Sequence, residues 1–190
     1  MSARDGQRGP GSGSGRTEFR QATLADRHEL AALYREAFPD EDLYPLVHAL
    51  LADTASVLSL AGAVGNGIVA HAAFTTCTVE EDDSRVALLG PLAVSRNYRR
   101  RGVGTAAVAA GIDRLRSAGI ARILVLGDPD YYGRLGFAVE DKVAPPYPMP
   151  DEWREAWQSL DLAPGSDAPV GRLSVPAPWR DESLWLPPAG

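Results

Sequence analysis

The sequence predicts an α/β fold in which helices flank a mixed, largely antiparallel central sheet. Apolar runs of strand length alternate along the chain with runs of helical periodicity. Asn66-Gly67 separates two of the strand-like runs and is typical of a tight hairpin, which makes the flanking strands antiparallel. Further on, a strand, a glycine-rich turn, a helix and a second strand follow in order, and such a crossover makes those two strands parallel.

Length and composition are those of a single globular domain. The chain has 190 residues, of which 45% are hydrophobic and 23% charged, and this is enough to bury a core. Its net charge of −6 argues against nucleic acid or a membrane surface as partner, because both attract basic proteins. No apolar stretch is long enough to span a membrane and the N-terminus lacks a signal-peptide core, so we expect a cytoplasmic location. The single cysteine, Cys77, permits no internal disulfide, and we expect no metal site.

The composition divides the chain into three segments. Residues 1–16 are Gly/Ser-rich and nearly devoid of apolar side chains, so we expect a disordered leader. Residues 17–140 form the core of the domain. Residues 141–190 form a C-terminal extension packed on that core, with a proline-rich linker, a short helix over Asp151–Leu160 that carries Trp153 and Trp157 on one face, and a last strand over Val170–Val175.

The first half of the core alternates between the two periodicities. Apolar residues at helical spacing end at Pro39, and the acidic run Asp40–Asp42 is typical of the start of a second helix. The expected elements are a strand over Thr17–Ala22, a helix over Ala25–Ala37, the second helix from Asp40, strands over Ser56–Ala61 and Ile68–Val79, and a turn over Glu80–Ser84.

The next strand, Val86–Val94, contains the pair Gly90-Pro91 inside an apolar run. Proline cannot donate a hydrogen bond to a neighbouring strand, so the pair predicts a bulge at which the strand bends and parts from its neighbour. The alternative is a loop between two short strands.

An anion-binding site is predicted directly after this strand. Gly102 and Gly104 allow the backbone to approach a phosphate, and Arg99, Arg100 and Arg101 add positive charge. The first N–H groups of the following helix lack intrahelical partners and favour an anion. The sequence therefore predicts a polyphosphate ligand, the alternative being a solvated arginine run. The helix covers Gly104–Ala118 with Gly119 as its C-cap, a parallel strand covers Ala121–Leu126, and a short helix begins at Asp128-Pro129.

Spacing narrows the class of polyphosphate. Neither Gly-x-Gly-x-x-Gly nor Gly-x-x-x-x-Gly-Lys-Ser/Thr is present at this turn. The observed Arg99-x-x-Gly102-x-Gly104 resembles the acetyl-CoA pyrophosphate loop of the GNAT superfamily of N-acetyltransferases, and Tyr132-x-x-x-Gly136-Phe137 resembles its second signature. Within the superfamily the chain resembles the YhbS-like branch, and the resemblance covers residues 19–139 well.

The resemblance implies an acetyl-CoA-dependent N-acetyltransferase that acts by direct attack of a primary amine, from a small molecule or a peptide, within a ternary complex. It implies a sheet splayed at the bulged strand, with a cleft for the pantetheine arm of the cofactor. Catalytically inactive binding of acyl-CoA is the alternative, and whether the chain forms a homodimer stays open. The implied cofactor-binding residues are Leu92, Ala93, Val94, Arg99, Arg100, Arg101, Gly102, Val103, Gly104 and Thr105.

Tyr132 is the candidate general acid, because a phenol can protonate the departing thiolate and its spacing matches the family signature. Tyr131 is the second candidate, and a packed aromatic side chain is the alternative for Tyr132. Asp128 is expected to be an N-cap rather than a base, and His71 a core histidine. Asp40–Asp42 either favour their helix N-terminus or receive a cationic amine.

Overall fold

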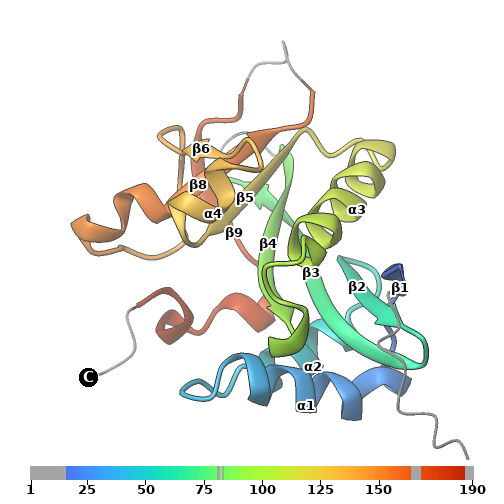
Figure 1. The fold of residues 1–190 in the computed structure, drawn as a ribbon. Coiled ribbons are helices and arrows are strands. Elements are labelled where there is room, and N and C mark those ends of the chain that lie inside the picture. Colours follow the sequence, from blue (N-terminus) through green and yellow to red (C-terminus); the bar gives the residue numbers. More distant parts are fainter. Residues whose placement is uncertain (1–15, 81, 83, 164–167, 187–190) are drawn as a thin grey trace, which may run out of the picture.

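The fold is built around one mixed sheet (Figure 1). The computed structural model describes residues 16–80, 82, 84–163 and 168–186. Among these residues only the β4–β5 and β7–β9 pairs are parallel, so the predicted mixed, largely antiparallel sheet is confirmed. The strands lie in the order β1 (Glu18–Gln21), β2 (Val57–Val64), β3 (Gly67–Val79), β4 (Arg85–Val94), β5 (Arg122–Leu126), β8 (Trp157–Asp161) and β6 (Ala138–Val139), while β9 (Gly171–Ser174) pairs with the end of β3 and with β7 (Val143–Ala144).

Apart from Arg16, the predicted disordered leader lies outside the described residues, as do positions 81 and 83 of the predicted turn. The predicted hairpin is confirmed, with its turn one residue earlier than expected. Gly65 takes the positive φ of 59° that this turn requires, and β3 already begins at Gly67.

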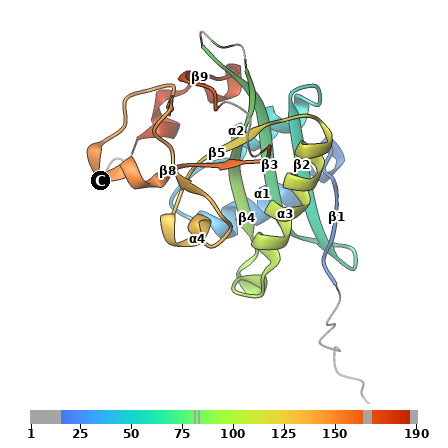
Figure 2. The same cartoon turned by 90° about the horizontal axis from the view of Figure 1, so that it is seen from above.

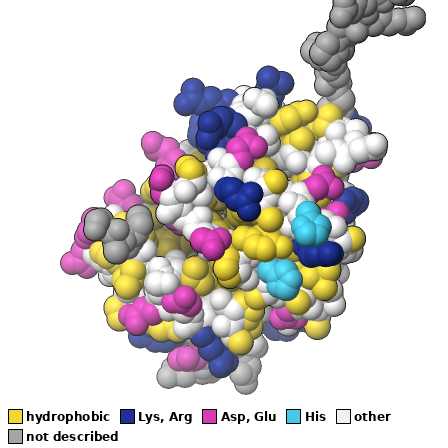
Figure 3. All heavy atoms as spheres, turned by 90° about the horizontal axis from the view of Figure 1, so that it is seen from below, with side chains coloured by type: hydrophobic (Ala, Val, Ile, Leu, Met, Phe, Trp, Pro, Cys, Tyr) yellow, Lys and Arg dark blue, Asp and Glu magenta, His cyan; other side chains and the backbone are white. Residues whose placement is uncertain are grey.

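Helices cover both faces of the sheet (Figures 1 and 2). The helices α3 (Val103–Ser117) and α4 (Pro129–Gly133) lie on one face, and α1 (Arg27–Ala37) and α2 (Tyr44–Ala52) lie on the other. The first helical segment begins with a capping box, in which the Asp26 carboxylate accepts a hydrogen bond of 2.8 Å from the Thr23 N–H. On the outer face over α1 and α2, acidic, basic and apolar side chains are interspersed (Figure 3).

Successive residues of the central strands face opposite layers, as the pleat of a strand requires. Leu88 of β4 and Leu124 of β5 face the layer formed by α2 and the C-terminal tryptophans. Leu89 and Val125, one residue further on, face α3. Burying each of these aliphatic side chains contributes roughly 1.5–3 kcal/mol, so the central strands are held from both sides.

The predicted bulge in β4 is confirmed. Ala72 of β3 lies opposite Leu92, but Phe74 lies opposite Leu89, so β4 has one more residue than β3 between these pairs. Pairing of β4 with β5 covers only Ala87–Leu89. The strand continues without interruption from Arg85 to Val94, which makes the alternative of a loop between two short strands wrong. Beyond Leu89 the two strands therefore part.

The helix predicted over Asp151–Leu160 is wrong. Asp151–Ala156 form a short 3-10 segment, and Trp157 begins strand β8, which pairs with β5. The tertiary environment outweighs the local pattern here, because β8 supplies hydrogen bonds to the edge of β5 and the Trp157 indole N–H donates to the Val143 carbonyl at 2.7 Å. The strand predicted over Val170–Val175 is confirmed as β9, and a domain boundary at residue 140 stays a prediction.

The close packing of α3 on β3 generates a prediction about stability. A Cβ atom at Gly111 would lie 2.1 Å from the Phe74 ring. We expect Gly111→Ala to lower the free energy of unfolding by about 1–3 kcal/mol through overpacking, despite the better helix propensity of alanine. Chemical denaturation measures this change.

Gly133→Ala is the matched control, because apart from its chain neighbours and its own helix backbone no atom of the described residues lies within 4 Å of the position that its Cβ would take. This variant should be as stable as the parent chain or slightly more stable. Equal stability of the Gly111→Ala variant and the parent chain would contradict the close approach of helix and strand.

Candidate active site

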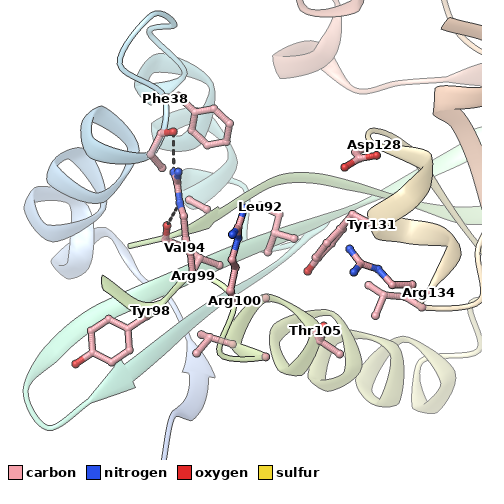
Figure 4. A pocket seen from close by; sticks show the side chains of 16 residues that line it. Phe38, Leu92, Val94, Tyr98, Arg99, Arg100, Thr105, Asp128, Tyr131 and Arg134 are labelled. Carbon is pink, nitrogen blue, oxygen red and sulfur yellow. Dashed lines mark hydrogen bonds between the residues drawn. The ribbon is translucent and has the colours of Figure 1, made fainter. Parts of the chain in front are cut away.

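A cavity of about 900 Å³ opens where β4 parts from β5. Its walls come from the end of α1, the last part of β4, the loop before α3, the first turn of α3, and α4 (Figure 4). The cavity therefore depends on the bulge, because a regularly paired β5 would close it.

The loop at one end of the cavity is shaped to bind an anion. Arg100 has a φ of 59° and Gly102 a φ of 77°, so two residues of the loop take left-handed conformations. Such turns bring successive backbone N–H groups toward one side, as in anion-binding nests. Gly102 is the N-cap of α3, and the first intrahelical bond is donated by Ala106 to the Gly102 carbonyl at 2.9 Å. The N–H groups of the first turn are therefore free of intrahelical partners.

Nine of the ten predicted cofactor-binding residues lie in the cavity wall. The exception is Arg101, whose guanidinium lies 5.8 Å from the centroid of the Tyr98 ring, outside the cavity. Consecutive side chains in a tight loop point in different directions, so the arginine run does not act as one unit. The nine are Leu92, Ala93, Val94, Arg99, Arg100, Gly102, Val103, Gly104 and Thr105.

The arginines at the cavity differ in their tasks. Arg99 donates hydrogen bonds to the carbonyls of Val94 at 3.2 Å and Ala37 at 3.0 Å, and so ties the end of β4 to the C-terminus of α1 (Figure 4). Arg100 lines the cavity from the loop, and Arg134 lines it from the C-cap of α4 (Figure 4). Sequence reasoning missed Arg134, although its place between Tyr132 and Gly136 of the second signature was a usable signal.

Tyr131, the second candidate acid, lines the cavity, and its phenol is aimed at the start of α3. The hydroxyl is buried and has no hydrogen-bond partner among the described residues. It lies 2.6 Å from the position that a Cβ would take at Gly104. Burial raises the pKa of this phenol, and the neighbouring Thr105 hydroxyl and Arg134 guanidinium offset part of that increase.

Tyr132 lies deeper and outside the wall of this cavity. Its ring packs edge-on against Phe137, with 5.4 Å between the ring centroids, and covers Gly127 at the end of β5. Burial is the main reason that its pKa lies well above the usual value, with smaller contributions from Tyr131 and Asp128. The pKa of the Tyr34 phenol is raised by burial, with a smaller contribution from Tyr132.

Asp128 and Asp42 each accept a backbone hydrogen bond at the start of a helix. Asp128 is an N-cap as predicted, with its carboxylate accepting a hydrogen bond of 2.9 Å from the Asp130 N–H, and it also lines the cavity. Asp42 accepts a hydrogen bond of 3.3 Å from the Tyr44 N–H at the start of α2. The run Asp40–Asp42 borders a second cavity of about 460 Å³, and Phe38 lines both cavities.

His71 is a fully buried core histidine with both ring nitrogens hydrogen-bonded. Nδ1 lies 2.8 Å from the Tyr34 hydroxyl oxygen, and Nε2 lies 2.7 Å from the Ser59 hydroxyl oxygen. Burial lowers the pKa of the imidazole to about 4, because a charged ring loses its hydration in the core. The ring is therefore neutral at physiological pH, and it is enclosed away from the cavity.

Cys77, the chain's one cysteine, is also buried, and burial raises the pKa of its thiol to about 12. Within the described ranges no cluster of three or more His, Cys, Asp or Glu side chains is arranged to hold a metal ion. The helices of the described residues are also too short or too polar to cross a membrane.

Comparison with known sequences identifies one family. The sequence profile of the Acetyltransferase (GNAT) family matches residues 26–137. YjhQ of Escherichia coli (strain K12), named an uncharacterized N-acetyltransferase, is 36% identical over 155 residues, which cover 77% of this chain and 86% of YjhQ. YhbS of the same strain, also named an uncharacterized N-acetyltransferase, is 34% identical over 113 residues, which cover 59% of this chain and 68% of YhbS.

Two solved structures share the architecture along most of their length. The crystal structure of YhbS from Escherichia coli in complex with CoA superposes with a TM-score of 0.74 and 27% identity, covering 87% of this chain and 92% of YhbS. A GNAT family acetyltransferase from Brucella melitensis in complex with acetyl-CoA superposes with a TM-score of 0.70 and 25% identity, covering 86% and 98%.

The buried His71 generates a prediction about the pH dependence of stability. Its pKa is about 4 in the folded chain and 6.5 in the reference state, so between these values the unfolded chain binds a proton that the folded chain does not. The free energy of unfolding should therefore fall as the pH decreases from 6.5 to 4, by a total on the order of 3 kcal/mol. Urea denaturation at several pH values measures this slope.

His71→Gln is the control, because it removes the titrating group. Hydrogen bonds from Arg20 and Thr23 lower the pKa of Asp26 to about 2. The contribution of Asp26 to the free energy of unfolding is therefore lost mainly below pH 4. A His71→Gln variant with the same slope as the parent chain between pH 6.5 and 4 would contradict the assignment.

Proposed function

The chain belongs to the GNAT acetyltransferase family and is an N-acetyltransferase, and from this premise we propose that it transfers the acetyl group of acetyl-CoA directly to a primary amine. The observation that carries the proposal is the start of α3, where a glycine N-cap and unpaired N–H groups face a cavity of about 900 Å³. The CoA and acetyl-CoA complexes of the two similar structures support the same ligand for this chain.

The residues present fit the diphosphate of coenzyme A. The first-turn N–H groups of Val103, Gly104 and Thr105 are free of intrahelical partners and would donate to phosphate oxygens. Arg100 and Arg134 approach from two walls of the cavity and supply positive charge (Figure 4). The buried, unpaired hydroxyl of Tyr131 beside Gly104 would gain a hydrogen-bond acceptor there.

The last part of β4 would hold the pantetheine arm. Leu92, Ala93 and Val94 line the cavity, and β4 has no β5 partner beyond Leu89. Its backbone groups on this side are therefore available to pair with the amides of the arm, as an added strand would. A backbone N–H of this segment would also polarise the thioester carbonyl.

We assign the proton donor to Tyr132. The phenol of Tyr131 lies against Gly104, at the diphosphate end of the cavity, and the pantetheine arm separates that end from the sulfur. Tyr132 packs over Gly127 at the end of β5, the strand from which β4 parts after Leu89. Its raised pKa keeps the proton on the oxygen at neutral pH, as a general acid requires.

Bound acetyl-CoA supplies the acetyl thioester. The neutral amine attacks its carbonyl carbon, so a C–N bond forms and the C–S bond breaks. Tyr132 donates a proton to the departing sulfur, while the amine nitrogen loses a proton to water. Water is the proton acceptor in this scheme, because neutral His71 is enclosed in the core and Asp128 is committed to its N-cap hydrogen bond.

One prediction of the proposed function concerns binding of the acetyl donor, acetyl-CoA. We expect acetyl-CoA to raise the melting temperature, because a ligand at a hundredfold excess over its Kd stabilises the native state by about 2.7 kcal/mol. Gly102→Val should abolish the shift, because a β-branched residue is strained at a φ of 77°. Differential scanning fluorimetry with millimolar acetyl-CoA measures both, and an unshifted parent chain would overturn the proposed donor.

Another prediction separates the roles of Tyr131 and Tyr132. Tyr132→Phe removes one hydroxyl and little volume, so turnover should fall about 10²- to 10⁴-fold while acetyl-CoA affinity is kept. Tyr131→Phe should instead weaken acetyl-CoA binding and leave kcat within a few-fold. Free-thiol release with an amine library measures turnover, and the thermal shift measures affinity.

The same assay tests the alternatives. If Tyr131→Phe abolishes kcat and Tyr132→Phe does not, Tyr131 is the acid. If acetyl-CoA binds but no amine in the library stimulates thiol release, the proposed transfer is not supported and an inactive binding module takes its place.

A further inference from the structure

A buried series of hydrogen-bonded polar side chains ends at the bulge of β4. Ser59 of β2, His71 of β3 and Tyr34 of α1 are each at most 2% exposed. The chain of contacts runs from the Ser59 hydroxyl to His71 Nε2 at 2.7 Å and from His71 Nδ1 to the Tyr34 hydroxyl at 2.8 Å. The Tyr34 hydroxyl then donates to the Pro91 carbonyl at 3.2 Å. Three elements thus converge on one backbone group of β4.

The position of the single proton on neutral His71 sets the direction of these hydrogen bonds. A neutral imidazole has one N–H, and burial keeps this ring neutral. With the proton on Nδ1, the ring donates to the Tyr34 oxygen, Tyr34 donates to the Pro91 carbonyl, and Ser59 donates to Nε2. Every donor in the chain then has an acceptor, which a buried polar network needs to be stable.

The Pro91 carbonyl lies within the bulge of β4. In a regular strand a carbonyl lies in the plane of the sheet and pairs with a neighbouring strand, but a bulge leaves its extra residue out of the ladder. The register shift lies between Leu89 and Leu92, and pairing with β5 ends at Leu89. The Tyr34 hydroxyl therefore adds a side-chain hydrogen bond from α1 at the point where the strand is irregular.

Holding the Pro91 carbonyl in one direction also holds the direction of the Leu92 N–H. The peptide group between Pro91 and Leu92 is planar, so the direction of the carbonyl determines the direction of the Leu92 N–H. Leu92 lines the cavity. We propose that Tyr34, held by His71, is a positioning residue that orients the Leu92 N–H toward the acetyl thioester carbonyl. This inference rests on the proposed function.

Tyr34→Phe tests the inference by removing only the hydroxyl. Because misplacing or losing one oxyanion donor costs about 10²- to 10³-fold, kcat for amine acetylation should fall by at least about tenfold. The KM for acetyl-CoA should stay within about twofold, because the Tyr34 hydroxyl bonds His71 and Pro91 rather than the loop that starts α3. Ser59→Ala is the matched control: it removes the far end of the same buried chain but leaves the contact with Pro91, so its kcat should stay within about twofold.

Two outcomes would overturn the inference: an unchanged kcat in Tyr34→Phe, or an equal loss of kcat in both variants. If Tyr34→Phe is too unstable to assay, His71→Asn and His71→Leu replace it. Asparagine keeps an N–H near the position of Nδ1 and leucine does not, so only the leucine variant should lose kcat by about tenfold. Equal kcat values in these two variants would also overturn the inference.

A readout without turnover separates this inference from the proposed function. Amide hydrogen exchange in the peptide covering residues 88–95 should be faster in Tyr34→Phe than in Ser59→Ala, because the bulge is held less firmly. Equal exchange rates would contradict the inference. An inactive parent chain would contradict the proposed function alone.

Discussion

The parting of β4 from β5 after Leu89 is the constraint on which the rest of the site depends. A parallel pair of central strands would otherwise be buried and closed by its own hydrogen bonds. The Gly90–Pro91 bulge ends that pairing and leaves a cavity, one wall of which is the part of β4 that no longer pairs with β5. The short crossover through α3 then brings a helix N-terminus to the same opening. One irregularity in a strand thus creates the room for a ligand and a backbone edge to hold it.

An opening of this kind weakens the sheet unless the bulge is supported, and here two side chains support it from the face that α1 and α2 cover. On the α1 face, Tyr34 bonds the Pro91 carbonyl. On the same face, in the layer of α2, the Trp179 ring lies 3.3 Å from the position that a Cβ would take at Gly90, and its indole N–H donates to Thr75 at 3.0 Å. Trp185 donates in turn to the Trp179 carbonyl at 3.1 Å. The C-terminal segment therefore does more than cover the core, because it packs directly against the strand that lines the cavity.

The charge around the main cavity is opposite in sign to the net charge of the chain. The chain as a whole carries a net charge of −6, yet three arginines and one aspartate line the main cavity. Arg99 is bound to the carbonyls of Val94 and Ala37, which leaves Arg100 and Arg134 to face a ligand. A local cationic site in an acidic protein favours a small polyanion over a nucleic-acid duplex, because a duplex requires an extended basic surface.

The sequence by itself determined the features that depend on neighbouring residues. The order of most helices and strands follows from periodicity, the tight turn before α3 from Gly102 and Gly104, and the bulge from Gly90-Pro91, since each needs only a local conformation. Tertiary structure decided what depends on distant contacts. Trp157 begins a strand because β5 offers an open edge, although its local pattern resembles a helix. Tyr131 and Tyr132 are neighbours with similar local signals, and only packing against Gly104 and Gly127 separates the cavity-lining phenol from the deeper one. The chain from Ser59 to Pro91 joins four elements, and no sequence pattern specifies that meeting, because it depends on how these elements pack.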